Sequence, residues 1–336
     1  MSMKSFFSSC SHFLIIFCLL GCDSKSTQVL HGSTMGTTYT VKVVTSQDLT
    51  NLHSEIKFEL QRINMIMSTY IKNSELSKLN SAPIAHRIGV SEELAEVLAL
   101  SKHINTITRG AFDVTVGPLV NLWGFGPKNN IENPPTSDDI SQYMDRVGMD
   151  KLVIEDFSAY RQADIYVDLS GIAKGFAVDS IASILEKKAF KDYLIEIGGE
   201  LKAGGRNSKG RLWSIAVEKP EVLQRSIFRT LPMKNLAMAT SGDYRNYREI
   251  DGERYSHLID PRTGRPITHQ LVSVTVLHSS TSFADGLATG LSVLSFKEAM
   301  EVAVKQNYAV LFIIKSGSEF SEHRSPALEK YFDDLS

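Results

Sequence analysis

Residues 164–205 read DIYVDLSGIAKGFAVDSIASILEKKAFKDYLIEIGGELKAGG and predict an alternation of strand and helix. DIYVDL (164–169) alternates polar and apolar residues, which is typical of a half-buried strand. A helix is expected from about Ala173 to Lys188, and YLIEI (193–197) predicts the next strand. The glycines of GGELKAGG (198–205) end that strand and favour a turn, although they could instead line a ligand site.

The same interleaving continues on both sides of this stretch. Helical spacing of apolar residues follows a strand at 38–44, and a second helix is expected from Ser91 to a stop at Gly110. The strand KLVIED (151–156) is expected before this stretch, and the strands expected after it are largely consecutive, namely LWSIAVE, LAMATS, YSHLID, LVSVTVL and YAVLFIIK. Consecutive strands favour an α+β fold with mixed and antiparallel sheets and packed helices. The final stretch, 321–336, is expected to be a solvated end.

Composition sets broad limits on the kind of protein. The chain has 336 residues, of which 43% are hydrophobic and 22% charged, as in an ordinary globular protein with one large domain or two lobes. A net charge of -2 and the lack of a basic stripe exclude nucleic acid as an expected partner.

The first residues have the pattern of a secretion signal. MSMKSFFSSCSHFLIIFCLLGC carries Lys4, an apolar run over residues 13–20 and Gly21 before Cys22. LLGC resembles the bacterial lipobox, in which the cysteine is lipidated after cleavage. We therefore expect a signal peptide at 1–21, a lipidated Cys22 with a linker over 22–30, and one domain over 31–336. The alternative is that this stretch is the buried start of a domain.

Cleavage before Cys22 has two consequences. It removes Cys10 and Cys18, so that one cysteine remains and no intrachain disulfide can form. Lipid chains on Cys22 would tether the domain to a membrane. Asp23 resembles the signal that keeps enteric lipoproteins on the inner membrane, so the expected location is the periplasmic face of a bacterial inner membrane.

Several familiar sites are absent from the sequence. It has no G-x-G-x-x-G after a strand, no G-x-x-x-x-G-K-[ST], no H-E-x-x-H and no G-x-S-x-G. The histidines show no zinc-type pairing, and one mature cysteine cannot build a thiolate site.

The apolar helical stretch FADGLATGLSVL (283–294) carries an acid near its start. Asp285 and Thr289 lie four residues apart, which places both side chains on one face of a helix. A carboxylate and a hydroxyl in this arrangement can hold a cation. The alternative is that Asp285 is a capping or solvated residue of the first turn.

Polar segments at strand ends or helix starts are candidates for a ligand site. Together they resemble the ApbE family of FAD:protein FMN transferases, and the resemblance runs from about His31 to Leu294. The segments that carry it, in order, are STMGTTY, STYIKNSELSKLN, TRGAFDVTVGPLVNLWGFGP, DLSGIAKGFAVD, EIGGELKAGG, ATSGDYRNY, YSHLIDPRTGRPI and ADGLATG.

The resemblance implies a fold and an activity. The fold would be an ApbE-like (T-fold-like) catalytic domain with two lobes. The activity would be Mg²⁺-dependent transfer of FMN from FAD, a substrate here, to a threonine or serine hydroxyl of a target protein, with release of AMP. The implied acceptors are flavin-carrying subunits of Nqr/Rnf-type redox complexes. The alternatives are an FAD pyrophosphatase that yields FMN and AMP, and a flavin-binding lipoprotein without turnover.

The resemblance also implies roles for individual residues. Asp285, Thr289 and the carbonyl of Ala173 would hold Mg²⁺, since hard oxygen donors suit this ion. His257 would be the base, although a lone histidine is often structural. The residues expected beside FAD are Met35, Tyr70, Ala111, Phe112, Asp113, Ser170, Phe176 and Ile259.

Alternatives remain open for several of these positions. Phe112 is as a residue type more typical of a core, and Tyr70 of a core or an interface. Lys174 could carry charge toward the pyrophosphate or lie on a solvated face. Asp168 is either a strand-end carboxylate or a support for the site, and Arg262 is expected to brace the turn after His257.

Overall fold

The computed structural model describes residues 25–126, 131, 133–221, 226–242, 247–250 and 252–335. Its main feature is an eight-stranded sheet in the order β1-β2-β6-β7-β10-β15-β16-β17, in which all neighbouring strands run antiparallel. The strands are β1 (Ser26–Thr34), β2 (Thr37–Thr45), β6 (Tyr193–Ile197), β7 (Glu200–Gly204), β10 (Leu236–Ser241), β15 (Leu271–His278), β16 (Ala309–Ser316) and β17 (Glu319–Arg324). The predicted α+β class is confirmed.

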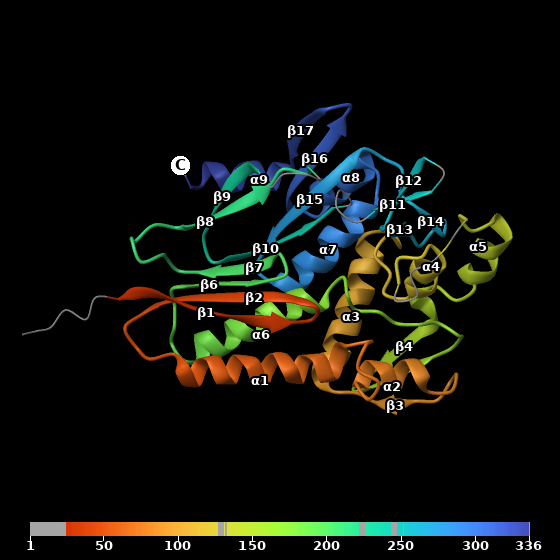
Figure 1. Cartoon of the computed structure of the whole chain (residues 1–336), viewed down its shortest axis with the longest axis horizontal. Helices are drawn as coiled ribbons and strands as arrows, with labels where there is room; N and C mark the ends of the chain where they lie inside the picture. The colour runs from red at the N-terminus through yellow and green to blue at the C-terminus, as the bar shows by residue number, and fades with distance from the viewer. Residues whose placement is uncertain are drawn as a thin grey trace, which may run out of the picture.

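Both faces of this sheet are covered, which explains why its central strands are apolar almost throughout. Helices α6 (Ala173–Lys187) and α7 (Thr281–Val293) pack on one face, with α1 (Thr50–Met67) beyond α6 (Figure 1). The hairpin of β8 (Trp213–Glu218) and β9 (Ile227–Met233) contributes to an apolar cluster on the other face, together with α9 (Pro326–Asp333). We call these elements the sheet lobe.

A second group of elements lies to one side of the sheet lobe, and α3 (Glu92–Ile107) runs between the two (Figure 1). We call this group the small lobe. It contains α2 (Glu75–Ser81), α4 (Gly117–Leu122), α5 (Ser137–Met144) and a three-stranded sheet of β3 (Ile88–Gly89), β5 (Ser158–Arg161) and β4 (Leu152–Glu155). The remaining elements are η1 (Met149–Lys151), β11 (Tyr247–Ile250), β12 (Glu253–Ser256), β13 (Ile259–Asp260), β14 (Arg265–Pro266) and α8 (Phe296–Lys305).

The two central helices approach each other unusually closely at their first turns. A Cβ at Gly175 of α6 would lie 2.4 Å from the carbonyl oxygen of Thr281 in α7. Since backbone atoms cannot move aside cheaply, only glycine fits at this position. The crossing brings the start of α6 against the first turns of α7.

The stretch 164–169, predicted as a strand, is not part of any sheet. Its alternation is real, because Ile165, Val167 and Leu169 are buried, but it forms only one isolated bridge, between Tyr166 and Val116. The side chain of Asn80 takes the place of a partner strand, accepting from Val167 N at 2.8 Å and donating to Val167 O at 2.7 Å. The alternating pattern of residues 164–169 therefore predicted correctly which side chains are buried, but it predicted wrongly that the segment pairs in a sheet.

Two predicted boundaries also change. Residues 26–30, expected in a linker, form the first half of β1 because they pair with β2. The C-terminal stretch is no solvated end: β17 pairs with β16, and α9 begins after Ser325, whose side chain caps it and which is itself fully buried. Leu328 of α9 is fully buried as well, so this stretch closes one face of the sheet lobe.

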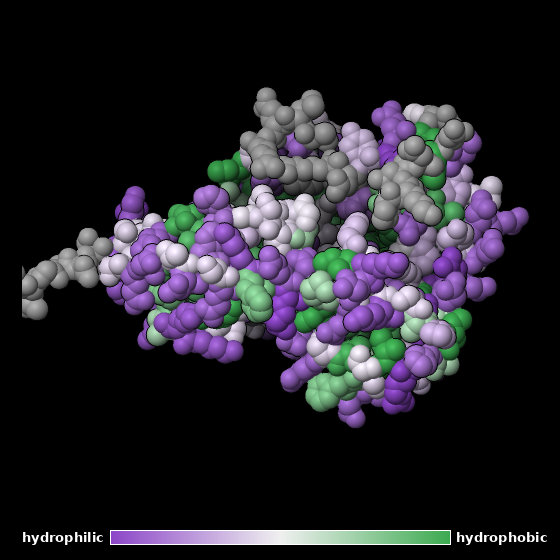
Figure 2. Space-filling model, turned by 60° about the horizontal axis from the view of Figure 1, so that its bottom comes forward, coloured by the Kyte–Doolittle hydropathy of each residue, from purple (hydrophilic) through white to green (hydrophobic). Residues whose placement is uncertain are grey.

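The signal sequence and Cys22 lie outside the described residues. Within the described ranges, no helix is both long enough and apolar enough to cross a membrane. Hydrophilic side chains dominate the face seen in Figure 2, and the hydrophobic ones are scattered among them.

Candidate active site

A cleft of about 1220 Å³ is lined from both lobes. Five of the predicted site residues line it: Met35, Tyr70, Ser170, Ala173 and His257. Asn121 and Phe125 of the small lobe, Lys174 of α6 and Arg248 of β11 contribute further walls. A second hollow, of about 540 Å³ along α3, holds none of the predicted residues. The larger cleft is therefore the candidate site.

Met35 reaches the cleft because it lies in the turn between β1 and β2. Thr34 pairs with Thr37, so the loop has two residues, and both Met35 (φ 49°) and Gly36 (φ 71°) are left-handed. Such a turn matches the twist of an antiparallel pair. Tyr70 also lines the cleft and is 84% exposed, so its ring is free to cover a planar ligand.

His257 lies between β12 and β13, half-buried on the cleft wall. Its ring meets the ring of Phe125 edge-on, with centroids 6.4 Å apart. The turn that follows is held as predicted: Gly264 N donates to Asp260 O at 2.8 Å, and the guanidinium of Arg262 binds the Asp260 carboxylate. A braced turn fixes the backbone close to His257.

The start of α6 forms the floor of the candidate site. Asp168 and Ser170 precede the helix, and Asp168 Oδ1 accepts from Ser170 N at 2.8 Å. Ala173 is the first residue of this helix of 15 residues. The N-terminus of a helix favours an anion because of its unpaired N–H groups and its dipole.

Asp285 is buried rather than capping. The N-cap of α7 is Ser280, whose side chain accepts from Phe283 N, so the capping alternative for Asp285 is excluded. Asp285 is 4% exposed, and its Oδ2 accepts from Gly175 N at 2.9 Å in the first turn of α6. Thr289 lies one turn further, where its Oγ1 would be 3.5 Å from a Cβ at Gly171. Both side chains thus face the segment that starts α6.

Lys174 lies between two buried carboxylates. Its Nζ is 3.4 Å from Glu200 Oε2 and 3.9 Å from Asp285 Oδ1. The solvated face that was one alternative for Lys174 is excluded, because its side chain is 25% exposed. Burial raises the pKa of Asp285 against the opposing effect of Lys174, and burial and then the charge of Asp285 raise the pKa of Glu200.

The donors around Asp285 are of the kind that a hard divalent cation takes. Across the described part of the chain, no three His, Cys, Asp or Glu side chains gather as metal ligands. The predicted set is of another type, with one carboxylate, one hydroxyl and one main-chain carbonyl, all oxygen donors. Glu200 Oε2 beside them is buried without a hydrogen bond. The local excess of buried negative charge fits a cation at this place.

Other predicted FAD residues are not on the cleft wall. Ala111 and Phe112 are 2% and 3% exposed, and Phe112 packs against glycines of α7. Asp113 accepts from Thr115 N, Thr115 Oγ1 and Met149 N, so its carboxylate is satisfied internally. Phe176 is partly buried against the main core, and Ile259 belongs to the apolar cluster around Trp123.

Glu200 was missed as a candidate. It directly follows the turn of Gly198 and Gly199, with φ values of 59° and 106°, that joins β6 to β7. Of the stretch GGELKAGG, predicted as a turn, only Gly198 and Gly199 form the turn, whereas residues 200–204 form strand β7. The sequence signal that could have indicated Glu200 is its place as an acid directly after two turn glycines, at the start of a strand.

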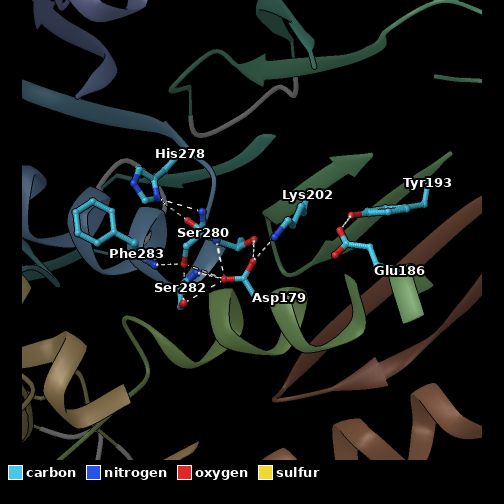
Figure 3. A network of polar contacts seen from close by, with 9 residues as sticks. Asp179, Glu186, Tyr193, Lys202, His278, Ser280, Ser282 and Phe283 are labelled. Atoms are coloured by element: carbon cyan, nitrogen blue, oxygen red, sulfur yellow. Dashed lines mark hydrogen bonds and ion pairs between the residues drawn. The ribbon is translucent and has the colours of Figure 1, made fainter. Parts of the chain in front are cut away.

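A carboxylate on α6 fixes the helix that carries Asp285 and Thr289 (Figure 3). Asp179 Oδ2 accepts from the backbone N–H groups of Thr281 and Ser282 at 2.8 and 3.0 Å. Its Oδ1 accepts from Lys202 Nζ at 2.9 Å, and the hydroxyls of Ser280, Thr281 and Ser282 donate as well. Asp179 thus caps α7 from a neighbouring helix.

Replacing Asp179 with asparagine is expected to lower the free energy of unfolding at pH 7 by about 2–4 kcal/mol. Burial opposes ionisation, but the Lys202 ammonium and the N–H groups of Ser282 and Thr281 outweigh it and hold the pKa of Asp179 below its usual value. The stabilisation by the ionised Asp179 carboxylate is therefore fully present above its pKa in the unfolded chain, about 3.9. It is lost as the pH falls through its lower pKa in the folded protein.

Urea unfolding of both proteins between pH 7 and pH 3 measures this contribution. The difference between them should shrink on acidification. Glu186→Gln on the same helix is the matched control: it removes the charge of the acceptor but keeps an oxygen that can accept from the Tyr193 hydroxyl, and it should cost roughly 1 kcal/mol or less. A constant Asp179→Asn difference across this range would rule out the ionised cap.

Comparison with known proteins agrees with the fold. The family profile described as ApbE family matches residues 35–312. An FAD:protein FMN transferase of Vibrio cholerae is 44% identical, covering 93% of this chain and 95% of the relative, and one of Haemophilus influenzae is 42% identical, covering 98% of both. The solved Flavin Transferase ApbE from Vibrio cholerae has a TM-score of 0.85 at 43% identity, covering 91% of this chain and 99% of that one. The chain belongs to the ApbE family.

Proposed function

We propose that this protein transfers FMN from FAD to a threonine or serine hydroxyl of a target protein and releases AMP. The observation that carries the proposal is the convergence of Met35, Tyr70, Ser170, Ala173 and His257 on one cleft. That cleft also receives the N-terminus of α6, which suits a pyrophosphate. The relatives named above are FAD:protein FMN transferases, which supports the same reaction for this chain.

The chemistry is an exchange at the FMN-side phosphorus of FAD. The acceptor oxygen forms a bond to this phosphorus, the bond to the bridging oxygen breaks, and AMP leaves with that oxygen. His257 takes the hydroxyl proton, since an imidazole near neutral pH can act as a base. Its position on the cleft wall and the braced turn behind it serve to orient this transfer.

The remaining residues bind and position. Tyr70 covers the flavin ring, and Ser170 with the first N–H groups of α6 receives the phosphates. Asp285, Thr289 and the Ala173 carbonyl would hold Mg²⁺, which when bound neutralises charge on the pyrophosphate. The other predicted FAD residues would support this site from the adjoining core; they are Ala111, Phe112, Asp113, Phe176 and Ile259.

The place of action follows from the first residues. A lipidated Cys22 would hold the protein on the periplasmic face of the bacterial inner membrane. Flavin-carrying subunits of Nqr/Rnf-type redox complexes, which act at that membrane, are the proposed acceptors.

Transfer is tested with the chain starting at Asp23, FAD, Mg²⁺ and an acceptor subunit with an exposed threonine. After a denaturing gel, flavin fluorescence on the acceptor band and AMP in solution are measured. Fluorescence that needs both Mg²⁺ and the acceptor threonine is the expected result. AMP release with a dark acceptor band would indicate an FAD pyrophosphatase, and neither signal, with an acceptor proven competent, would indicate a flavin-binding lipoprotein.

A further inference from the structure

Lys174 is the counter-ion of two carboxylates that are otherwise buried without compensation. Glu200 and Asp285 are each 4% exposed, and their oxygens lie 3.4 and 3.9 Å from Lys174 Nζ. Among the described residues, no other cation comes within ion-pair distance of either carboxylate. A buried charge without a partner is strongly destabilising, so the fold depends on this ammonium.

The turn between β6 and β7 fits closely around the side chain of Lys174. A Cβ at Gly198 would lie 3.2 Å from Lys174 Cδ, so the lysine stem runs closely over the turn that joins β6 and β7. Gly198 has a φ of 59°, so its conformation and its lack of a side chain both favour glycine there. Glu200, two residues after Gly198, is thereby placed beside the ammonium of Lys174.

The two carboxylates are not equivalent partners. Asp285 already accepts from Gly175 N through Oδ2, whereas Glu200 Oε2 is buried with no hydrogen bond. Glu200 also lies nearer to Lys174 Nζ than Asp285 does. Glu200 therefore depends on the ammonium more than Asp285 does.

Asp285 is also the proposed carboxylate ligand of Mg²⁺, and the present inference rests on that part of the proposed function. An ammonium and a divalent cation at the same carboxylate repel each other, and in a partly buried site this repulsion is little screened. Binding of the metal thus favours withdrawal of Lys174 Nζ from Asp285. Glu200 provides the place to which it can withdraw without losing a partner.

We propose that Lys174 stands in for the metal at Asp285 in the metal-free protein and moves onto Glu200 alone when a divalent cation binds. Lys174 lines the cleft, so the exchange takes place at the cleft wall. In both states each of the two carboxylates has a cation beside it. By linkage, whatever strengthens the hold of Lys174 on Asp285 weakens metal binding by the same factor.

The test measures binding of Mg²⁺ alone to the full-length chain in detergent micelles, by isothermal titration calorimetry, together with thermal unfolding in EDTA and in Mg²⁺. Lys174→Met removes the ammonium and keeps most of the stem. We expect it to lower the Tm in EDTA, to regain most of the loss in Mg²⁺, and to tighten Mg²⁺ binding by about tenfold, within the roughly 5- to 150-fold range of coupled sites.

Lys202→Met is the matched control. Lys202 is also a partly buried lysine on a carboxylate, with a side chain 19% exposed, but its partner is Asp179 and not Asp285. This variant should lower the Tm equally in EDTA and in Mg²⁺ and leave the affinity for Mg²⁺ unchanged.

Glu200→Gln tests the other half of the exchange. With Glu200 neutral, Lys174 has only Asp285 as a charged partner, so Mg²⁺ binding should weaken several-fold. In the Lys174→Met background the same change should have little effect, because the influence of Glu200 acts through the ammonium. If Lys174→Met does not accumulate, Glu200→Gln alone decides, since it keeps the ammonium.

Two results would overturn the inference while the metal site stands. One is a wild-type chain that binds Mg²⁺ with an affinity unchanged or weakened by Lys174→Met. The other is a Glu200→Gln variant whose affinity for Mg²⁺ is unaltered, or is lowered equally in the wild-type and Lys174→Met backgrounds. If the wild-type chain binds no Mg²⁺ alone, the titrations are repeated with FAD present, and a chain that still binds none overturns the metal assignment within the proposed function instead.

Discussion

Replacing Asp285 with asparagine is expected to lower the rate of FMN transfer by about 10²–10³-fold and to leave a residual rate that no longer depends on Mg²⁺. Asparagine keeps the shape and can still accept from Gly175 N, so the contact between α6 and α7 is preserved. What it removes is the charged oxygen of the proposed metal ligand.

The measurement is the rate of acceptor fluorescence across a Mg²⁺ titration, with Tm as a check on folding. Asp164→Asn is the matched control, because the Asp164 side chain is 65% exposed and pairs with Arg146 and Arg161. It should leave both the rate and the Mg²⁺ dependence unchanged. A variant Asp285→Asn with normal rate and normal Mg²⁺ dependence would show that Asp285 holds no metal.

Replacing His257 with glutamine is expected to lower kcat by about 10²–10⁴-fold, the usual contribution of a general base. Glutamine retains hydrogen-bonding groups at the half-buried cleft wall but cannot take a proton. Because FAD is bound mainly by other residues of the cleft, the KM for FAD should change little. The split between kcat and KM separates a base from a residue that only shapes the site.

The pH profile gives a second readout for His257. A rate that rises as the imidazole loses its proton produces an acidic limb, and this limb should disappear in His257→Gln. His86→Gln is the control, since His86 is exposed and outside the cleft wall. Equal losses of kcat and of FAD affinity with an unchanged pH profile would assign His257 a structural role.

Local patterns in the sequence were sufficient to predict features that depend on a single element, such as helix caps and turns. Ser91 caps α3 as predicted, accepting from Leu94 N, because a cap depends only on residues three positions apart. The turn from Asp260 to Gly264 and the two-glycine turn before Glu200 were likewise predictable, since each needs only proline or glycine in a fixed place. The α+β class followed from the order of such elements.

The candidate site could be predicted only in part. The order of motifs along the chain indicated the ApbE family and named five residues that line the cleft. Spacing could not reveal that Phe112 and Asp113 lie behind the cleft wall, because a motif reports which residues are near in sequence and not which side chains reach a cavity.

The sequence by itself determined the periodicity of burial, the turns, the caps and the family. The tertiary structure decided which elements pair and which charges meet. Residues 164–169 have the pattern of a strand, yet the N–H and C=O of Val167 pair with the side chain of Asn80, 87 positions away. Asp285 meets Gly175 across 110 positions, and Lys174 joins Glu200 to the same cluster. Periodicity records only whether a side chain is buried, whereas its partners depend on contacts between distant segments that form when the whole chain packs.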